Sequence, residues 1–486
     1  MANPPPKIRW AIFFAVALLA LAVRLPKLGE RPMHTDEAVN AYITGELLAG
    51  ESFHYDPQDR HGPALFALAE PVARLLGAKT FSGLTETQLR LTPAIAGSAT
   101  VLLFGAGVEW FGFIACLVAA LLFAFAPLPL YYSRFFIHET LFVAATLGLI
   151  LSGGRMLKTN SFSSAALAGF CAALMLACKE TAVLHFLALG LAAAIGWRFR
   201  AAGRMPPART WLTAALFFLV AGILLFTWGG QNWAALADLF RAIPNFAARA
   251  GGEGHEKPFW HYAVLLAGGW SGAVILGLAA LGTVRAFHPP RQIFLAGYAL
   301  FIAVIYSAIP YKTPWLAMNL WLPLAILAGV AIEGTWFASA NLSVRGTTLV
   351  CLVALGLLIV RDTRQWVFRF PADEKNPYAY AHTGEDLLRL PARLEELARE
   401  NKNSNPRIAV IAADAWPLPW YLRKYSQVGF WQPGQETGGA DFFITTTDVS
   451  GKLAGRLKDF RPEYFGARPN VLFILWSQQN TLPSHE

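Results

Sequence analysis

Long stretches of uncharged, apolar residues recur through the first three quarters of this chain, and they constrain its fold more than any other feature. A helix needs about 20 such residues to cross roughly 30 Å of hydrocarbon. The stretches lie near residues 8–25, 90–110, 112–130, 139–154, 163–178, 181–197, 210–228, 261–284, 292–309, 315–335 and 345–361. The sequence therefore predicts an all-α polytopic membrane protein with about eleven transmembrane helices.

Composition supports this class and excludes others. Hydrophobic residues make up 55% of the 486 residues and charged residues 15%, against roughly 25% charged in soluble domains. An ordinary soluble enzyme and a disordered chain are both excluded. The four cysteines, Cys116, Cys171, Cys178 and Cys351, lie inside apolar runs at spacings that match no zinc or redox motif. We interpret them as small buried residues.

The distribution of charge predicts the topology. The net charge is +9, and lysine and arginine accumulate in cytoplasmic loops. With eleven spans and a cytoplasmic N-terminus, the inside segments carry 11 basic and 2 acidic residues, the outside loops 13 and 14, and the tail 16 and 15. The basic excess is a topology signal, so we expect an integral inner (plasma) membrane protein with no nucleic-acid partner.

Two parts of the chain are expected. Residues 1–361 form a transmembrane module whose first outer loop, 24–89, contains amphipathic helical stretches at 38–49 and 64–77. Residues 362–486 become charged and turn-rich. Their pattern predicts helices at 385–401 and 418–425 and strands at 407–412, 441–446 and 470–475. We therefore expect a C-terminal soluble α/β domain on the extracytoplasmic side.

Polar residues on the predicted outer face are the candidates for chemistry. Asp36 and Glu37 open the helical stretch 38–49. Adjacent carboxylates at a helix start can act as a general base or bind a metal. They can equally cap the helix and stabilise its dipole, and the sequence leaves both readings open.

Two further candidates lie in turns of the predicted outer face. His61 precedes Gly62-Pro63 and is either a ligand or a turn residue without a chemical role. Arg134, followed by His138 and Glu139, lies at the outer junction of two spans. Arginine binds phosphate through its forked donors, but it can also extend to lipid headgroups, and Glu139 can serve as a helix cap.

The last candidates lie between apolar spans. Lys179 and Glu180 separate two of them, and charges at such a depth are costly and tend to mark sites. They could also form a purely structural pair. A second segment, 310–315, supplies Tyr311, Lys312 and Trp315, and Lys312 could instead lie among headgroups. His185, inside a predicted span, is interpreted as an interhelical hydrogen-bonding residue.

These motifs, in this order, resemble those of the GT-C fold membrane glycosyltransferases. The motifs are His34-Thr-Asp-Glu-Ala38, His61-Gly-Pro63, Tyr132-Ser-Arg-Phe-Phe-Ile-His-Glu139, Lys179-Glu-Thr181 and Pro310-Tyr-Lys-Thr-Pro-Trp315. The nearest likeness is to the branch of protein O-mannosyltransferases, lipid A aminoarabinose transferases and Rgt-type bacterial enzymes, and to a subfamily named for archaeal flippase-activity-associated proteins. The resemblance covers residues 8–335, and the tail only in general plan.

The resemblance implies an inverting transfer of a hexosyl or pentosyl group. The donor would be a polyprenyl-phosphate sugar held among membrane lipids, and the acceptor an extracytoplasmic protein, lipid or glycan. Asp36 would be the base that activates the acceptor or would orient the acceptor, and Glu37 would support it. The implied substrate-binding residues are Arg134 and Lys179 on the phosphate, with His61, His138, Glu139, Glu180, Tyr311, Lys312 and Trp315 lining the site.

Several points stay open at this stage. No cofactor is certain, and a divalent metal is possible, with Asp36, His61 and Glu139 as candidate ligands. The turn at His61 departs from the Lys-Pro-Pro type turn of the aminoarabinose transferases, so substrate contacts cannot be carried over. The alternative function is a non-catalytic accessory protein or transporter for lipid-linked sugars. An ion-coupled transporter should carry ionisable residues at mid-membrane, where only His185 is found.

Overall fold

The chain folds into two compact units, each assembled from segments that are separate in sequence. The structure is a computed structural model that describes residues 4–58, 61–198, 205–252, 254–286, 290–338, 341–453 and 455–478. The membrane unit comprises Met1–Leu28, Glu51–Val72 and Arg90–Pro371, and the C-terminal unit comprises Gly29–Gly50, Ala73–Leu89 and Ala372–Glu486. Arg200 and Arg204, counted in the topology argument, lie outside the described residues.

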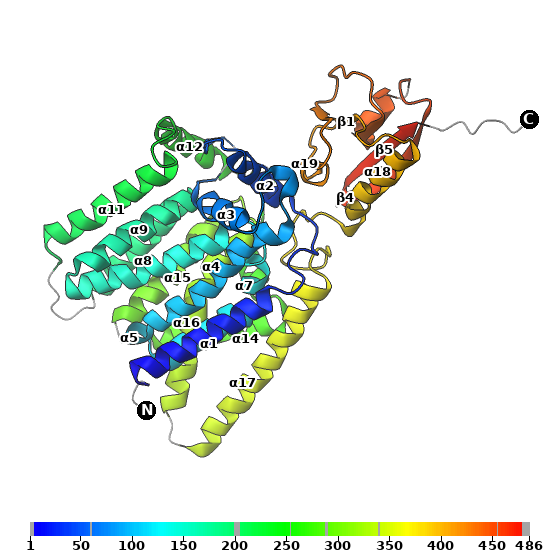
Figure 1. Ribbon diagram of the computed structural model, residues 1–486. Helices are drawn as coiled ribbons and strands as arrows, with labels where there is room; N and C mark the ends of the chain where they lie inside the picture. The colour runs from blue at the N-terminus through cyan, green and yellow to red at the C-terminus, as the bar shows by residue number, and fades with distance from the viewer. Residues whose placement is uncertain are drawn as a thin grey trace, which may run out of the picture. The chain divides into compact units, whose positions relative to one another are not determined.

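Helices fill the first 370 residues of the chain (Figure 1). Their bounds are α1 (Pro6–Arg24), α2 (Thr35–Leu48), α3 (Ala64–Leu75), η1 (Phe81–Gly83), α4 (Glu86–Ala106), α5 (Val108–Phe111), α6 (Phe113–Phe125), α7 (Pro127–Tyr132), α8 (Glu139–Thr159), α9 (Phe162–Cys178), α10 (Ala182–Arg198), α11 (Ala208–Phe226), α12 (Ala235–Arg249), α13 (His261–Leu266), α14 (Gly269–Arg285), α15 (Pro290–Ala308), η2 (Pro314–Leu316), α16 (Ala317–Ala338), α17 (Leu342–Thr363) and η3 (Arg364–Arg369). Of these, α2 and η1 belong to the C-terminal unit.

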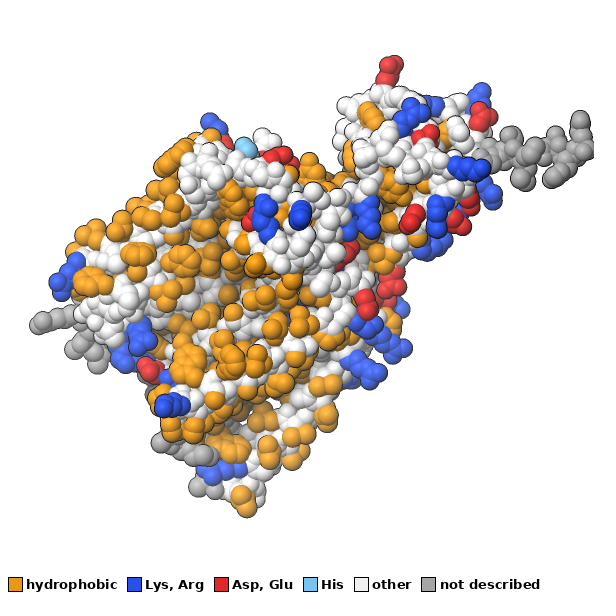
Figure 2. Space-filling view, viewed as in Figure 1, with side chains coloured by type: hydrophobic (Ala, Val, Ile, Leu, Met, Phe, Trp, Pro, Cys, Tyr) orange, Lys and Arg blue, Asp and Glu red, His pale blue; other side chains and the backbone are white. Residues whose placement is uncertain are grey.

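The prediction of a helical membrane protein is confirmed. Within the described residues, seven helices are long and apolar enough to cross a membrane, and four shorter apolar helices, Phe113–Phe125, Phe162–Cys178, Ala182–Arg198 and Gly269–Arg285, fall at other predicted spans. The number of eleven spans stays a prediction. Apolar side chains cover the helices (Figure 2), and Leu216, Leu219 and Leu224 of α11 are more than half exposed, as expected of a surface that faces lipid.

Two predicted spans are interrupted. The span predicted at 261–284 is divided into α13 and α14, and Gly269, at the start of α14, has a φ of +72° that favours glycine. The span predicted at 112–130 is divided because α6 ends at Phe125 and α7 begins at Pro127. Proline lacks a backbone N–H and suits the first position of a new helix.

Small residues allow the helices to pack closely. A Cβ added at Gly169 of α9 would lie 2.0 Å from the carbonyl oxygen of Ala214 in α11. A Cβ added at Gly282 of α14 would lie 1.9 Å from the carbonyl oxygen of Leu327 in α16. Backbones this close exclude any side chain, which is the usual reason for small residues between membrane helices.

A tight turn joins α8 to α9 and makes them antiparallel neighbours. Asn160 closes α8 in the left-handed conformation, and Ser161 begins α9 by accepting a hydrogen bond from the Ser164 backbone N–H at 3.4 Å. Asparagine tolerates this conformation better than most residues, and serine is a favoured N-cap. Figure 1 shows α8, α9 and α11 side by side.

The tail folds into a small α/β layer, as predicted. Its elements are η4 (Glu385–Leu388), α18 (Arg389–Glu400), β1 (Ile408–Ile411), α19 (Leu418–Tyr421), β2 (Val428–Trp431), β3 (Phe442–Thr446), α20 (Thr447–Ser450), η5 (Gly451–Leu453), β4 (Phe460–Arg468) and β5 (Val471–Gln478). The strand order is β2-β1-β3-β5-β4. Strand β1 is parallel to β2 and β3, whereas β5 is antiparallel to β3 and β4.

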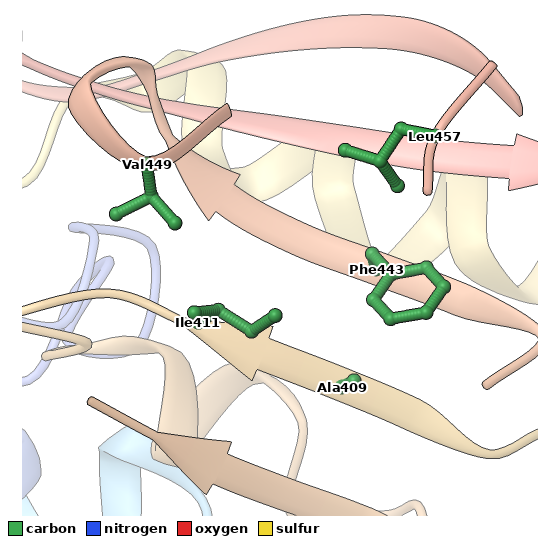
Figure 3. Close-up of a cluster of buried hydrophobic side chains, with 5 residues drawn as sticks. All are labelled: Ala409, Ile411, Phe443, Val449 and Leu457. Carbon is green, nitrogen blue, oxygen red and sulfur yellow. The ribbon is translucent and has the colours of Figure 1, made fainter. Parts of the chain in front are cut away.

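One face of this sheet is packed by a hydrophobic cluster. Ala409 and Ile411 of β1 lie on the same face as Phe443 of β3, and Val449 and Leu457 cover them (Figure 3). All five are at most 3% exposed. The opposite face of these strands is also apolar and buried, with Val410, Phe442 and Ile444 fully covered, so β1 and β3 form the centre of the unit.

Part of the first outer loop belongs to the same unit as the tail, which the sequence does not indicate. The buried indole of Trp420 donates to Glu86 Oε1 at 2.8 Å. The Met33 backbone N–H donates to the Tyr421 hydroxyl at 2.9 Å, and Thr383 Oγ1 donates to the Met33 carbonyl at 2.7 Å. These bonds attach the segment before α2 and the first residue of α4 to the tail.

Replacing Phe443 by alanine should loosen the C-terminal unit. Phe443 is 2% exposed and its ring lies 5.3 Å from that of Phe460, and removal of a buried aromatic ring costs about 3–5 kcal/mol. Limited proteolysis of the purified chain should cut residues 372–478 faster in this variant. Phe430→Ala is the matched control, because Phe430 of β2 is 44% exposed. Equal cleavage rates in the two variants would contradict the assignment of Phe443 to the core.

Candidate functional site

An ion pair joins the neighbouring ends of α8 and α9 in the membrane unit. Glu139 begins α8, Lys179 follows the last residue of α9, and Lys179 Nζ donates to Glu139 Oε1. The side chains are 9% exposed for Lys179 and 2% for Glu139. A buried ammonium or carboxylate is stable only when it is paired, so the pair requires these two helix ends to stay together.

The turn around His61 is pressed against the same end of α9. A Cβ added at Gly62 would lie 2.3 Å from the Ala177 carbonyl oxygen, closer than any side chain can approach. On its other side, the Gly62 carbonyl lies 3.1 Å from His138 Nε2. The glycine therefore fixes the position of His61 relative to the residues that follow α9.

Glu180 collects two hydrogen-bonding partners from this loop. The Tyr55 hydroxyl donates to Glu180 Oε1 at 2.5 Å, and His61 Nδ1 lies 3.1 Å from Glu180 Oε2. Burial raises the pKa of Glu180, but the hydrogen bond and charge of His61, with the Tyr55 hydroxyl, outweigh it and leave that pKa below its ordinary value. Burial and the nearby Glu180 carboxylate raise the pKa of Tyr55. The carboxylate is therefore ionised and the phenol protonated.

His138 completes the group, which we call the outer cluster: Tyr55, His61, His138, Glu139, Lys179 and Glu180. The rings of His61 and His138 lie 5.5 Å apart, edge to face. Burial lowers the pKa of His138 well below its ordinary value, and the charges of His61 and Lys179 lower it further. His138 is thus a neutral member of the cluster near pH 7. Five of the six members were predicted as site residues, and the structure brings them together.

His185 satisfies the role predicted for it. It lies on α10 and is fully buried. Its Nδ1 lies 2.8 Å from the Tyr298 hydroxyl and its Nε2 2.7 Å from the Tyr306 hydroxyl, both on α15. A neutral imidazole has one donor and one acceptor nitrogen, so both are satisfied and the residue joins two helices.

Arg134 has different contacts from those expected of a phosphate ligand. Its Nη1 donates to the carbonyls of Arg24 at 2.6 Å and Pro26 at 2.7 Å, and its Nη2 donates to that of Lys27 at 3.1 Å. The guanidinium also lies 4.8 Å from the centre of the Phe368 ring. It is 7% exposed. A cation at the carbonyl end of a helix is stabilising, so Arg134 secures the end of α1.

Lys312 is likewise engaged by backbone. Its Nζ donates to the carbonyl of Ile309, just beyond the end of α15, at 2.5 Å. It also donates to the carbonyl of Lys257 at 3.1 Å. The residue is 1% exposed, and burial lowers its pKa. These contacts differ from the cavity-lining role expected for it.

The neighbours of Lys312 line a short two-stranded contact. Tyr311 pairs with Glu256 in an antiparallel bridge, and its ring lies 4.8 Å from that of His255. Trp315 is 8% exposed, with its ring 6.1 Å from that of Phe135. The segment 310–315 therefore packs on both the 254–257 loop and the segment that contains Arg134.

The two carboxylates of the first loop lie in the C-terminal unit and have unequal environments. Glu37 is fully buried, accepts from the His34 backbone N–H at 3.2 Å, and pairs with Arg31 at 3.3 Å. The helix is capped by His34, whose Nδ1 accepts from the Asp36 backbone N–H at 3.0 Å. The Asp36 side chain is 46% exposed. Glu37 thus takes the structural role, whereas the carboxylate of Asp36 is accessible.

The tail contributes to the start of this helix. Arg468 of β4 donates to Thr35 Oγ1 at 3.0 Å and also binds the carboxylate of Asp414. His34 Nε2 lies 3.0 Å from the Tyr380 carbonyl oxygen. The two residues that precede Asp36 are therefore held by the tail, which makes the position of Asp36 dependent on the rest of the C-terminal unit.

The residues that the structure describes contain no preformed metal centre. Among them, no three or more His, Cys, Asp or Glu side chains are grouped so that they could hold a metal ion. Of the candidate ligands in the membrane unit, Glu139 is paired with Lys179 and His61 lies beside Glu180. A divalent metal stays a prediction.

The sequence analysis did not identify Tyr55 as a member of the outer cluster, and it did not show why residue 62 has to be a glycine. Tyr55 lies in an irregular segment whose pattern carries no helical or strand signal, so nothing in the sequence connects it with Glu180. The His-Gly-Pro turn was recognised, but the closeness of Gly62 to Ala177 depends on two segments that are 115 residues apart.

In sequence, the chain is similar to two kinds of sugar transferase. Residues 61–226 match the model of the family described as dolichyl-phosphate-mannose-protein mannosyltransferase. Over 171 residues the chain is 31% identical to the undecaprenyl phosphate-alpha-4-amino-4-deoxy-L-arabinose arabinosyl transferase of Pseudomonas paraeruginosa, covering 34% of this chain and 31% of that protein. The chain therefore spans about a third of the length of this curated relative.

The fold is similar to those of two solved structures, one of similar length and one longer. ArnT from Cupriavidus metallidurans bound to undecaprenyl phosphate gives a TM-score of 0.66 at 15% identity, covering 96% of this chain and 98% of ArnT. The Archaeoglobus fulgidus oligosaccharyltransferase AglB, in complex with an inhibitory peptide and a dolichol-phosphate, gives 0.57 at 12% identity, covering 98% and 75%. At these identities the likeness shows the fold.

Gly62→Ala should destabilise the membrane unit. The new Cβ would force Gly62 away from Ala177, and overpacking of this kind costs about 1–3 kcal/mol. The thermal unfolding midpoint of the purified protein should fall. Gly222→Ala in α11 is the matched control, since no heavy atom lies within 4 Å of its added Cβ, and alanine favours a helix. A midpoint lowered equally in both variants would contradict the close approach at Gly62.

Lowering the pH should reduce the stability of the folded protein, because Glu180 becomes protonated. Because the folded-state pKa of Glu180 lies below its unfolded value of about 4.3, the stabilisation is present above that value and is lost as the pH falls through the folded pKa. The unfolding midpoint of the wild type should fall more between pH 5 and pH 3 than that of Glu180→Gln. If the midpoints of the wild type and Glu180→Gln fell in parallel, the pairing of Glu180 with His61 and Tyr55 would contribute nothing to stability.

Proposed function

We propose that this chain, which has the GT-C fold of the membrane glycosyltransferases in the ArnT and protein O-mannosyltransferase branch, moves a sugar from a polyprenyl-phosphate donor to an extracytoplasmic acceptor. The resemblance predicted from the sequence motifs is confirmed. The observation that carries the proposal is the buried Lys179–Glu139 pair, a cation held at the end of apolar helices. The solved relatives ArnT and AglB, bound to undecaprenyl phosphate and a dolichol-phosphate, support a lipid-phosphate donor.

Lys179 is the proposed phosphate ligand. An ammonium carries three N–H donors, and the structure engages one of them with Glu139. Donors remain for the phosphate oxygens, where negative charge grows as the sugar departs. A preorganised cation in an apolar surround stabilises such charge far more than water does. Glu139 keeps the ammonium in place when no donor is bound, and the polyprenyl chain lies among the helices.

Asp36 is the proposed general base. It is the more exposed of the two adjacent carboxylates, because Glu37 is engaged by the His34 backbone and by Arg31. Glu37 therefore supports the helix start and does not react. The Asp36 backbone N–H is bound by His34, so the helix start fixes the direction of the carboxylate.

The reaction is a single displacement. The acceptor oxygen or nitrogen attacks the anomeric carbon of the sugar while its proton passes to the carboxylate of Asp36. The bond between that carbon and the phosphate oxygen breaks, and its electron pair leaves on the polyprenyl phosphate, held by Lys179. Attack opposite the leaving group inverts the anomeric configuration. Because phosphate leaves as a stable anion, cationic stabilisation matters more than a strong general acid.

The remaining predicted residues take positioning roles in this proposal. His61 and Glu180 hold the turn beside α9, and Arg134 and Lys312 secure helix ends. Tyr311 and Trp315 order the segment that contains Lys312. We assign the reaction to the extracytoplasmic face, with the N-terminus cytoplasmic, from the basic excess of the inside segments.

The first test is turnover by Asp36→Asn. Purified protein in proteoliposomes receives a radiolabelled polyprenyl-phosphate sugar pool with a membrane extract as acceptor source, and release of polyprenyl phosphate is measured. The wild type should turn over, and Asp36→Asn should lose about 10²- to 10⁴-fold, the usual contribution of a general base. Asp459→Asn, a change at an exposed carboxylate of the tail, should leave turnover unchanged.

Lys179→Gln separates donor binding from chemistry. It should weaken saturable donor binding as well as turnover, whereas Asp36→Asn should weaken turnover alone. Donor binding by the wild type with no release of polyprenyl phosphate from any donor would overturn the transferase and favour the accessory or transporter function. Equal turnover by wild type and Asp36→Asn would reject Asp36 as the base.

A further inference from the structure

A large apolar cavity lies in the membrane unit, in the halves of the helices that are remote from the outer cluster. Its volume is about 1180 Å³, and it is lined by residues of α8, α9, α10, α11 and α15. Small-molecule pockets usually measure about 300–1,000 Å³. Small residues such as Gly153, Gly190 and Ala172 create the space. The size and lining suit a long hydrocarbon chain better than a water-soluble metabolite.

The position of the cavity follows from the helices that line it. Helix α8 carries Glu139 at its start and contributes residues 149–158 to the cavity. A helix of this length spans about 30 Å, so the outer cluster and the cavity lie toward opposite ends of it. Helix α10 likewise begins next to the outer cluster and contributes residues as far as Trp197.

The far end of the cavity has the chemistry of a lipid headgroup site. Among the described lining residues, the charged ones are Lys158 and Arg291, and three tryptophans, Trp110, Trp197 and Trp211, accompany them. Arg291 lies 4.4 Å from the centre of the Trp110 ring and donates to the Glu109 carbonyl at 2.7 Å. Tryptophan marks the interface between hydrocarbon and water. Lys158 and Arg291 thus supply positive charge to the lining of this cavity.

We propose that this cavity binds one anionic glycerophospholipid, with its acyl chains among α8–α11 and its phosphate on Lys158 and Arg291. Charge complementarity decides the occupant. The tail of a polyprenyl-phosphate donor that entered from the outer cluster would bring no negative charge to Lys158 and Arg291, whereas the phosphate of a glycerophospholipid would. The proposal does not depend on the transferase reaction.

The bound lipid would stabilise the helices that carry the outer cluster. An empty apolar cavity leaves its lining without dispersion contacts on one side. Filling it joins α8, α9 and α10 at one end, while Lys179 and Glu139 join α8 and α9 at the other. The lipid is therefore expected to raise the thermal unfolding midpoint of the protein.

Replacing a glycine by leucine can fill the cavity and still leave the fold intact. No heavy atom lies within 4 Å of a Cβ added at Gly190, so Gly190→Leu places a side chain in the cavity without displacing backbone. Leucine also favours a helix over glycine. Gly277→Leu in α14 is the matched control, because its added Cβ is equally free and Gly277 does not line the cavity.

The experiment measures lipid retained by detergent-purified protein, using native mass spectrometry and unfolding midpoints with added phosphatidylglycerol or phosphatidylcholine. The wild type and Gly277→Leu should each retain about one phosphatidylglycerol, which raises the midpoint more than phosphatidylcholine does. Gly190→Leu should lose at least tenfold in retention. Lys158→Gln with Arg291→Gln should abolish the preference for the anionic lipid while the fold, judged by midpoint without lipid, persists.

Three outcomes would overturn the proposal. Retention by Gly190→Leu equal to that of Gly277→Leu would show that the lipid binds elsewhere on the protein. Equal effects of the two phospholipids on the wild type would remove the role of Lys158 and Arg291. Displacement of the retained lipid by undecaprenyl phosphate, but not by phosphatidylglycerol, would make the cavity a site for the polyprenyl chain.

Discussion

The ion pair between Lys179 and Glu139 is the interaction on which the membrane unit depends. Neither charge is stable in an apolar environment without the other, and they belong to the ends of two different helices. The short turn at Asn160 makes α8 and α9 antiparallel, so a pair at their far ends closes a hairpin of two long helices. Gly62 then packs on the end of α9 and brings His61 to Glu180. One electrostatic requirement thus assembles most of the outer cluster.

Unequal burial of adjacent residues gives Asp36 and Glu37 different functions. Successive helical residues point about 100° apart, so when Glu37 turns inward to Arg31 and the His34 backbone, Asp36 turns toward the surface. Glu37 therefore takes the capping role, and the carboxylate of Asp36 is the one accessible for the proposed catalytic role. Arg468 and Tyr380 of the tail hold Thr35 and His34, which links the geometry of the proposed base to a domain that lies more than 300 residues later in the chain.

Apolar length predicted where helices lie, because the cost of exposing backbone to hydrocarbon allows few other solutions. The pattern also predicted β1, β3 and β5, but not β2, which is only four residues long, or β4, whose Arg461, Glu463 and Arg468 conceal its alternation. The partners of Arg134 and Lys312 could not be predicted, since backbone carbonyls exposed at helix ends leave no trace in residue type. The substrate-site roles of both cations stay predictions, and the structure adds that their side chains bind backbone carbonyls.

Glycine in this protein serves two opposite purposes, and the difference explains how one set of helices can hold both an ion pair and a cavity. At Gly62 and Gly169 the missing side chain lets another backbone approach to within contact distance, so these positions are filled by protein. At Gly153 of α8 and Gly190 of α10, by contrast, no heavy atom lies within 4 Å of an added Cβ. A packed interior normally closes such a gap. Hydrocarbon can fill it instead when the surrounding solvent is lipid, so an apolar ligand completes the packing that side chains leave open.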